Sequence, residues 1–193
     1  MSDHTDTSGD DHAATMGFER LVFFSDAVLA IAITLMALEI RLPEMGQDAS
    51  EQQIVTAVQG LAPHIFVYVL SFLVIGTYWV LHHRLFRMIR RYDYRLIWLN
   101  VVFLMFVAFV PAATNALGSY SFSPTVTALY AVSLALVGLS EYFVWWYALR
   151  QKFVQHVSSA PRLDRYISAR ILTPPLVFLL SLLTIPLSPN VTE

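Results

Sequence analysis

The sequence predicts an all-α protein, a polytopic membrane helix bundle with five transmembrane helices. Of its 193 residues, 56% are hydrophobic and only 13% are charged, whereas about 25% of the residues in soluble proteins are charged. The mean hydropathy is +0.58. The charged residues are concentrated in an N-terminal tail and in connecting segments, which leaves long apolar runs between them. Such runs are typical of helices that cross a bilayer.

The composition also excludes several classes of function. The chain contains no cysteine, which rules out disulfides, thiolate metal sites and cysteine nucleophiles. The basic residues lie where membrane topology requires them, so no nucleic-acid partner is indicated. No GxSxG, HExxH or glycine-rich phosphate motif is present. We therefore expect neither an enzyme nor a bound cofactor or metal site.

Residues 1–16 are polar and acidic and show no apolar periodicity, so they are predicted to form a disordered cytoplasmic tail. His4 and His12 lie there among aspartates, and a solvated tail is favoured over a weak metal site. Residues 17–193 are predicted to be a single transmembrane channel domain. Its helices are expected at approximately residues 18–42, 60–83, 94–117, 124–149 and 166–187. Pro174 and Pro175 predict a kink within the last helix.

Two arginine-rich segments, after the second and fourth predicted helices, indicate the orientation. Basic residues favour the cytoplasmic side, so both segments and the N-terminus are expected there. Arg84, Arg87 and Arg90 recur at every third position, as in a voltage sensor. They follow an already complete span, however, so an interfacial anchor is favoured.

The first helix carries two kinds of side chain on different faces. Ile31, Leu35 and Leu38 are spaced by four and three residues and therefore share one face. Asp26 lies more than a quarter turn away from that face. A carboxylate in a membrane helix is costly without partners and is a functional-site hypothesis by default.

Partners for Asp26 are available on the next two helices. Trp79 and either His82 or His83 lie near the end of the second helix, and Asn100 lies near the start of the third. All are expected at the cytoplasmic side, as is Arg20. A polar network among them would satisfy groups that are costly to leave unpaired in lipid. A packing role and a gating role for this network are equally favoured.

Two glutamates lie apart from this network. Glu141 lies inside the fourth predicted helix, where pairing with an interfacial arginine or tyrosine is favoured over a permeation or protonation site. Glu39 lies near the outer end of the first helix. A charge at a pore mouth and an ordinary solvated residue are equally favoured interpretations.

The segment from Arg20 to Asp26 reads R-L-V-F-F-S-D. It resembles the R-x-x-x-F-S-D signature of the transmembrane protein 175 family, which comprises endolysosomal potassium channels of animals and their bacterial homologues. The resemblance implies that the first helix lines a pore, with an apolar constriction in place of a carbonyl selectivity filter. Carried onto this sequence, the constriction residues are Ile31, Leu35 and Leu38, with Thr34 beside them. The resemblance also implies that Phe24, Ser25 and Asp26 bond to polar residues of neighbouring helices, here Trp79, His82 or His83, and Asn100.

The function implied by the resemblance is a potassium-permeable cation channel with a hydrophobic gate. Animal members carry two repeats in each chain and this sequence carries one, so a homotetramer in a bacterial inner membrane is expected. Its permeant ions are potassium and other monovalent cations. Family members have six helices in each repeat, one more than predicted here. A secondary or proton-coupled transporter is the alternative, although no inverted repeat is visible, and a non-transporting scaffold would show no ion flux.

Overall fold

The computed structural model describes the backbone of residues 7–46, 48–120, 123–154 and 161–184, and the side chains of 16–46, 48–120, 123–154 and 166–183. The described residues form an all-helical bundle. Its elements are α1 (Thr7–Leu38), α2 (Glu51–Gly60), α3 (Ala62–Met88), α4 (Tyr94–Ser119), α5 (Pro124–Arg150), α6 (Pro161–Ser181) and a 3₁₀ turn (Leu182–Thr184).

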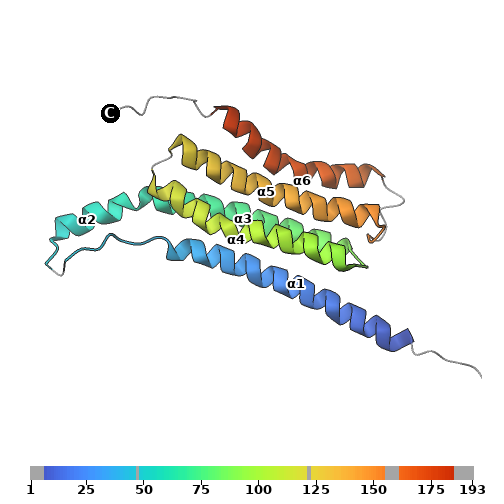
Figure 1. Cartoon of the computed structure of the whole chain (residues 1–193). Coiled ribbons are helices and arrows are strands. Elements are labelled where there is room, and N and C mark those ends of the chain that lie inside the picture. The colour runs from blue at the N-terminus through green and yellow to red at the C-terminus, as the bar shows by residue number, and fades with distance from the viewer. Residues whose placement is uncertain (1–6, 47, 121–122, 155–160, 185–193) are drawn as a thin grey trace, which may run out of the picture.

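The long helices run side by side, with α1 along one edge of the bundle and α6 along the opposite edge (Figure 1). Helix α1 packs against α3 and α4, whereas α5 packs against α4 and α6. We call the end that holds the α3–α4 connection the basic end, because Arg84, Arg87 and Arg95 lie there. The opposite end holds the α1–α2 connection and α2, and we call it the acidic end.

Local sequence signals fix the beginnings of several helices. The Asp93 carboxylate accepts a hydrogen bond of 2.8 Å from the Leu96 amide and so caps α4. Ser50 and Gln53 form a capping box at the start of α2. Pro63 and Pro124 occupy the first turns of α3 and α5, where the missing amide hydrogen costs nothing.

Within the described residues, four helical segments are long and apolar enough to cross a membrane: Met16–Leu38, Glu51–Met88, Tyr94–Ser119 and Pro124–Arg150. They correspond to the first four predicted spans. The predicted fifth span, 166–187, overlaps α6, whose described apolar part, Tyr166–Ser181, is shorter. Both Pro174 and Pro175 lie inside α6, and its ribbon changes direction along its length (Figure 1).

Two boundaries differ from the sequence prediction. Helix α1 begins at Thr7, so part of the segment predicted as a disordered tail is helical, while residues 1–6 lie outside the description. Asp10 and Asp11 lie near its N-terminus, where negative charge favours a helix. Helix α2 forms in residues that were largely predicted as a loop. The Ser50-x-x-Gln53 spacing is the signal that predicts its start.

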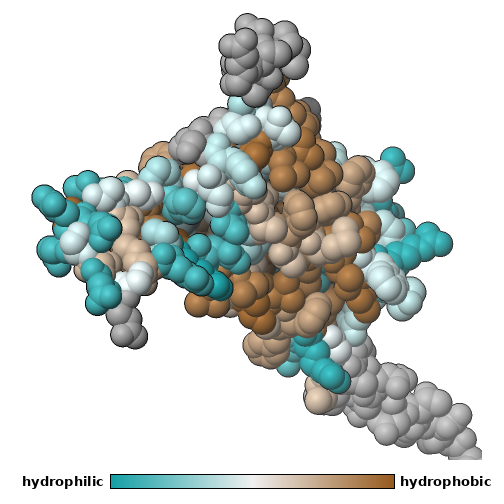
Figure 2. Space-filling view, turned by 60° about the vertical axis from the view of Figure 1, so that its left-hand side comes forward, coloured by the Kyte–Doolittle hydropathy of each residue, from teal (hydrophilic) through white to brown (hydrophobic). Residues whose placement is uncertain are grey.

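Small residues and hydrogen bonds, more than a hydrophobic driving force, hold helices together within a bilayer. Gly138 of α5 is the clearest case, because a Cβ atom at this position would lie 2.6 Å from the Tyr78 hydroxyl and 2.7 Å from Pro175 Cδ. Because Gly138 has no Cβ atom, α3 and α6 can approach α5 closely. On the face shown in Figure 2, a broad apolar area lies between hydrophilic residues at its two sides.

Candidate functional site

Helix α1 presents an exposed apolar stripe and, on its other side, a buried face. Ile31, Leu35 and Leu38 are 56%, 43% and 64% exposed. Thr34 is exposed beside them, and its hydroxyl donates a 2.9 Å hydrogen bond to the Ile31 carbonyl. The buried face consists of Leu21, Ser25, Leu29, Ala32 and Met36. The stripe therefore lies on the side of α1 that α3 and α4 leave uncovered.

Two polar contacts hold α1 against its neighbours. Ser25 is fully buried and accepts a 2.8 Å hydrogen bond from Asn100 Nδ2, while its own hydroxyl donates to the Leu21 carbonyl at 2.9 Å. Asp26 Oδ1 accepts a 2.9 Å hydrogen bond from Trp79 Nε1. The structure thus brings together four of the polar residues singled out in the sequence, and they join α1 to α3 and α4 toward the basic end.

The two histidines have different surroundings. His82 is buried, and its Nδ1 lies 3.2 Å from both carboxylate oxygens of Glu141, which is fully buried. A carboxylate only accepts hydrogen bonds, so the His82 tautomer with a hydrogen on Nδ1 can donate it to Glu141. The His82 ring also lies 4.9 Å from the ring of Phe103, nearly parallel to it. His83 instead stacks on Trp79, with 5.8 Å between ring centroids.

In the structure, therefore, the partner of Asp26 is Trp79. The carboxylate that contacts a histidine is that of Glu141. The sequence favoured an interfacial arginine or tyrosine for Glu141, and this differs from the arrangement observed. The sequence does show an ionisable residue in the fourth span and a histidine in the second. Their pairing could not be predicted, because sequence spacing does not show which helices are adjacent.

The remaining predicted members of the network lie apart from it. Phe24 is 53% exposed and lies on the same side of α1 as Ile31. Arg20 is exposed and makes no hydrogen bond or ion pair within the described part of the chain. Neither residue is therefore part of the buried contacts that join α1 to α3 and α4.

A second polar group lies deeper in the bundle and was not singled out in the sequence. The Thr114 hydroxyl donates to Ser71 at 3.0 Å, and the hydroxyls of Ser71 and Tyr130 lie 2.9 Å apart. Thr114 also lies 3.6 Å from the Met36 sulfur. These contacts tie α1, α3, α4 and α5 together on the acidic-end side of the Ser25 contact.

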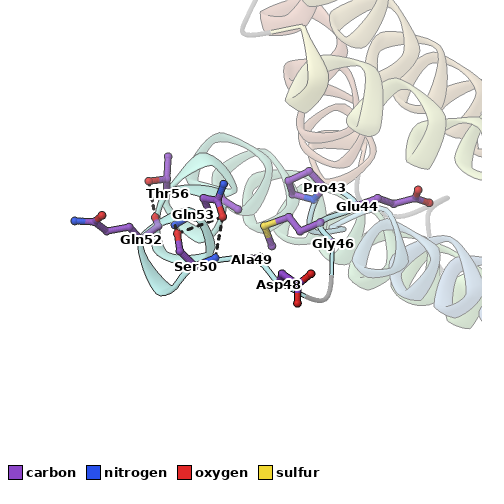
Figure 3. Close-up of a pocket in the computed structure, with 11 residues that line it drawn as sticks. Pro43, Glu44, Gly46, Asp48, Ala49, Ser50, Gln52, Gln53 and Thr56 are labelled. Carbon is purple, nitrogen blue, oxygen red and sulfur yellow. Dashed lines mark hydrogen bonds between the residues drawn. The ribbon is translucent and has the colours of Figure 1, made fainter.

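The α1–α2 connection and α2 line a polar hollow of about 810 Å³ at the acidic end (Figure 3). Glu44 and Asp48 line it together with Ser50 and Gln53 of the capping box. Glu39 is also exposed near this end. Among the residues whose side chains are described, no group of three His, Cys, Asp or Glu could hold a metal ion. His4 and His12 lie outside that set.

The basic end is closed by contacts between two connecting segments. Ile89 and Val154 form an antiparallel bridge, and the Arg90 amide donates to the Phe153 carbonyl at 2.8 Å. The Tyr147 hydroxyl donates to Asp93 Oδ2 at 2.6 Å. Burial acts to raise the pKa of Asp93, but the hydrogen bonds from Tyr147 and the α4 backbone, with nearby Arg95, hold this pKa below its usual value.

These features define a multi-pass membrane protein whose edge helix presents an apolar stripe. Residues 20–111 match the family model described as endosomal/lysosomal potassium channel TMEM175. A potassium channel of Chryseobacterium sp. (strain P1-3) is 35% identical over 121 residues, which cover 63% of this chain and 59% of that protein. The human endosomal/lysosomal proton channel TMEM175 is 31% identical over 131 residues, covering 67% of this chain and 25% of that protein.

The fold likeness extends over most of the chain. The crystal structure of a lysosomal potassium-selective channel TMEM175 homolog from Chamaesiphon minutus superposes with a TM-score of 0.77 at 27% identity. The match covers 90% of this chain and 88% of that one. These matches support membership of the chain in the TMEM175 family. It spans less than two thirds of the length of the two curated relatives.

Proposed function

We propose that the chain forms a potassium-permeable cation channel in which four copies of α1 surround a central pore. The observation that carries the proposal is the exposed stripe of Ile31, Leu35 and Leu38 on an edge helix whose opposite face is fixed. The names of the bacterial relative and of the solved homologue, both potassium channels, support the same function. A single chain presents one such stripe, so a closed ring requires several copies with cyclic symmetry.

In this channel the stripe acts as a hydrophobic constriction. Rings of Ile31, Leu35 and Leu38 side chains exclude water, and an ion must lose part of its hydration to pass. Such a ring favours the monovalent cation with the lower cost of dehydration. Thr34 adds a hydroxyl next to the narrowest part of the proposed pore. Acidic residues around the hollow, such as Glu44 and Asp48, raise the local concentration of cations.

The arrangement in the cell follows from the arginine distribution. We propose that the basic end faces the cytoplasm of a bacterial cell, together with the N-terminus, because arginines favour that side of the inner membrane. The acidic end then forms the outer mouth. The proposed partners are three further copies of the chain, the surrounding lipid, and potassium and other monovalent cations.

A proton-coupled transporter is the second candidate function. The buried His82–Glu141 pair favours it, because ionisable residues inside a membrane bundle often serve proton pathways. The human relative is named a proton channel. Reconstituted protein separates the candidates: a channel gives passive, electrogenic potassium flux, whereas a carrier gives flux that saturates with a coupling ion.

The deciding experiment for the pore is Ile31→Asn in liposome potassium flux and planar bilayers. A polar ring should hydrate and lower the barrier, and a decrease of about 1.4 kcal/mol raises conductance about tenfold. The matched control is Leu73→Asn, because Leu73 of α3 is 62% exposed but lies outside the stripe. Unchanged current in a folded Ile31→Asn tetramer, or an equal increase in Leu73→Asn, contradicts the assignment.

A further inference from the structure

A groove runs between α3 and α6 on the side of the bundle away from α1. It consists of two adjoining cavities of about 380 and 450 Å³, which share Leu81 and Arg170 as lining residues. Many of the side chains that line it are exposed in the single chain, so the groove is open to the surroundings of the bundle. We call it the α3–α6 groove.

The smaller cavity of the groove is largely apolar. Val74, Leu81 and Phe178 line it, and Arg170 is the charged residue at the point where the two cavities meet. Thr77 and Thr173 also face it, but their hydroxyls donate to the carbonyls of Leu73 and Ala169 within their own helices, at 2.8 Å each. Satisfying the hydroxyls in this way removes their need for a polar partner in the groove. This cavity therefore suits a hydrocarbon chain.

The second cavity lies nearer the basic end and is cationic. Arg84 and Arg87 of α3, one helical turn apart, line it together with Arg170 of α6. Among the residues whose side chains are described, no carboxylate lines this cavity, and none of the three arginines has an ion-pair or hydrogen-bond partner there. Guanidinium groups bind phosphate through paired, charge-assisted hydrogen bonds.

Helix packing holds the groove open. Helix α6 packs on α5, where Gly138 admits Pro175, rather than closing onto α3. Tyr78 lies at the back of the groove, and its hydroxyl is fixed by a 3.2 Å hydrogen bond to the Leu134 carbonyl. The shape is therefore present before any ligand arrives, which lowers the entropic cost of binding.

We propose that the α3–α6 groove binds an anionic phospholipid from the bilayer, with an acyl chain in the apolar cavity and the phosphate against Arg84, Arg87 and Arg170. The order of the two cavities along α3, apolar toward the middle of the membrane and cationic at its margin, matches the order of tail and headgroup in a lipid. Basic pockets between membrane helices bind anionic headgroups in this way. A free phosphate ion would leave the apolar cavity unused.

The test is native mass spectrometry of the full chain in detergent, titrated with phosphatidylglycerol, with phosphatidylcholine and with inorganic phosphate. Both lipids carry a phosphate, but the choline ammonium of phosphatidylcholine offsets that charge and is repelled by the arginines. Phosphatidylglycerol should therefore bind about tenfold more tightly than phosphatidylcholine. Arg170→Gln and the double variant Arg84→Gln/Arg87→Gln should each remove this preference. Arg150→Gln is the matched control, because Arg150 stands 4.9 Å over the Trp146 ring at the same end but outside the groove.

A second variant tests the acyl-chain cavity. Thr77→Trp fills it while leaving all three arginines in place, and should weaken phosphatidylglycerol binding several-fold without changing the response to inorganic phosphate. An equal loss in Arg150→Gln, or phosphate binding as strong as lipid binding, overturns the proposal. So does efficient disulfide formation between copies of Thr173→Cys, the only thiol in that variant, because the groove would then be a subunit interface. The readout is independent of ion flux.

Discussion

Asp26 and Glu141 are both carboxylates within membrane-spanning helices and both pair with α3, but their surroundings differ. Asp26 is partly buried and accepts from Trp79, which is itself partly exposed. Glu141 is fully buried against His82, whose ring packs on the rings of Phe86 and Phe103. The first contact lies at the edge helix α1 and the second inside the bundle. We infer that the Glu141 pair stabilises the fold, whereas the Asp26 contact positions the helix that carries the stripe.

The largest expected effect is that of Glu141→Ala. It leaves His82 buried without its partner, and breaking one side of a buried pair destabilises a protein by about 3–5 kcal/mol. Glu141→Gln keeps an acceptor for His82 Nδ1 and should be milder. Replacing both residues by leucine should restore much of the loss. Thermal unfolding in detergent, followed by loss of monodisperse protein, measures the series. Equal unfolding temperatures for Glu141→Ala and Glu141→Gln would show that the pair does not stabilise the fold.

An intermediate effect is expected at Asp26. Asp26→Ala removes one partly exposed hydrogen bond, equivalent to about 1 kcal/mol, and Trp79→Phe removes the same bond from the other side. A double-mutant cycle should therefore show coupling between them. We expect Asp26→Asn to reduce assembly, measured by light scattering, more than the potassium-to-sodium flux ratio. A changed flux ratio in a fully assembled Asp26→Asn protein would place Asp26 in the ion path and reverse the comparison.

The same contrast shows what the sequence could predict. The contacts of α1 were predictable because polar side chains stand out in otherwise apolar helices. These are the polar residues of the R-x-x-x-F-S-D segment, Trp79 and Asn100. The structure joins Ser25 to Asn100 and Asp26 to Trp79. The apolar stripe could be identified from its spacing alone. Its role at a pore remains a prediction, because one chain does not show what covers that face.

The rest depends on the arrangement of helices in space. No spacing indicates that α5 lies beside α3, so the partner of Glu141 could not be predicted. The α3–α6 groove arises where α6 packs on Gly138 of α5, far from α3 in the sequence. The start of α2 was predictable in principle from Ser50 and Gln53, but the acidic residues around them favoured a loop.

The smallest effect is expected at Asp93, a third carboxylate, which lies outside the membrane-spanning segments and accepts from Tyr147 and the Leu96 amide. Its pKa is lowered in the folded chain, so it stabilises the fold above its usual pKa of 3.8. That contribution is lost as the pH falls through the folded value. Asp93→Asn keeps a good helix cap but cannot titrate. Acid unfolding should therefore lose part of its pH dependence below pH 3.8 in this variant.

Tyr147→Phe is the matched control for Asp93, because it removes one hydrogen bond and leaves both the carboxylate and the α4 cap in place. It should lower stability slightly at neutral pH and bring the acid transition closer to the usual pKa of the carboxyl group. Circular dichroism across an acid titration measures both variants. An unchanged pH dependence in Asp93→Asn would mean that other carboxylates determine acid stability.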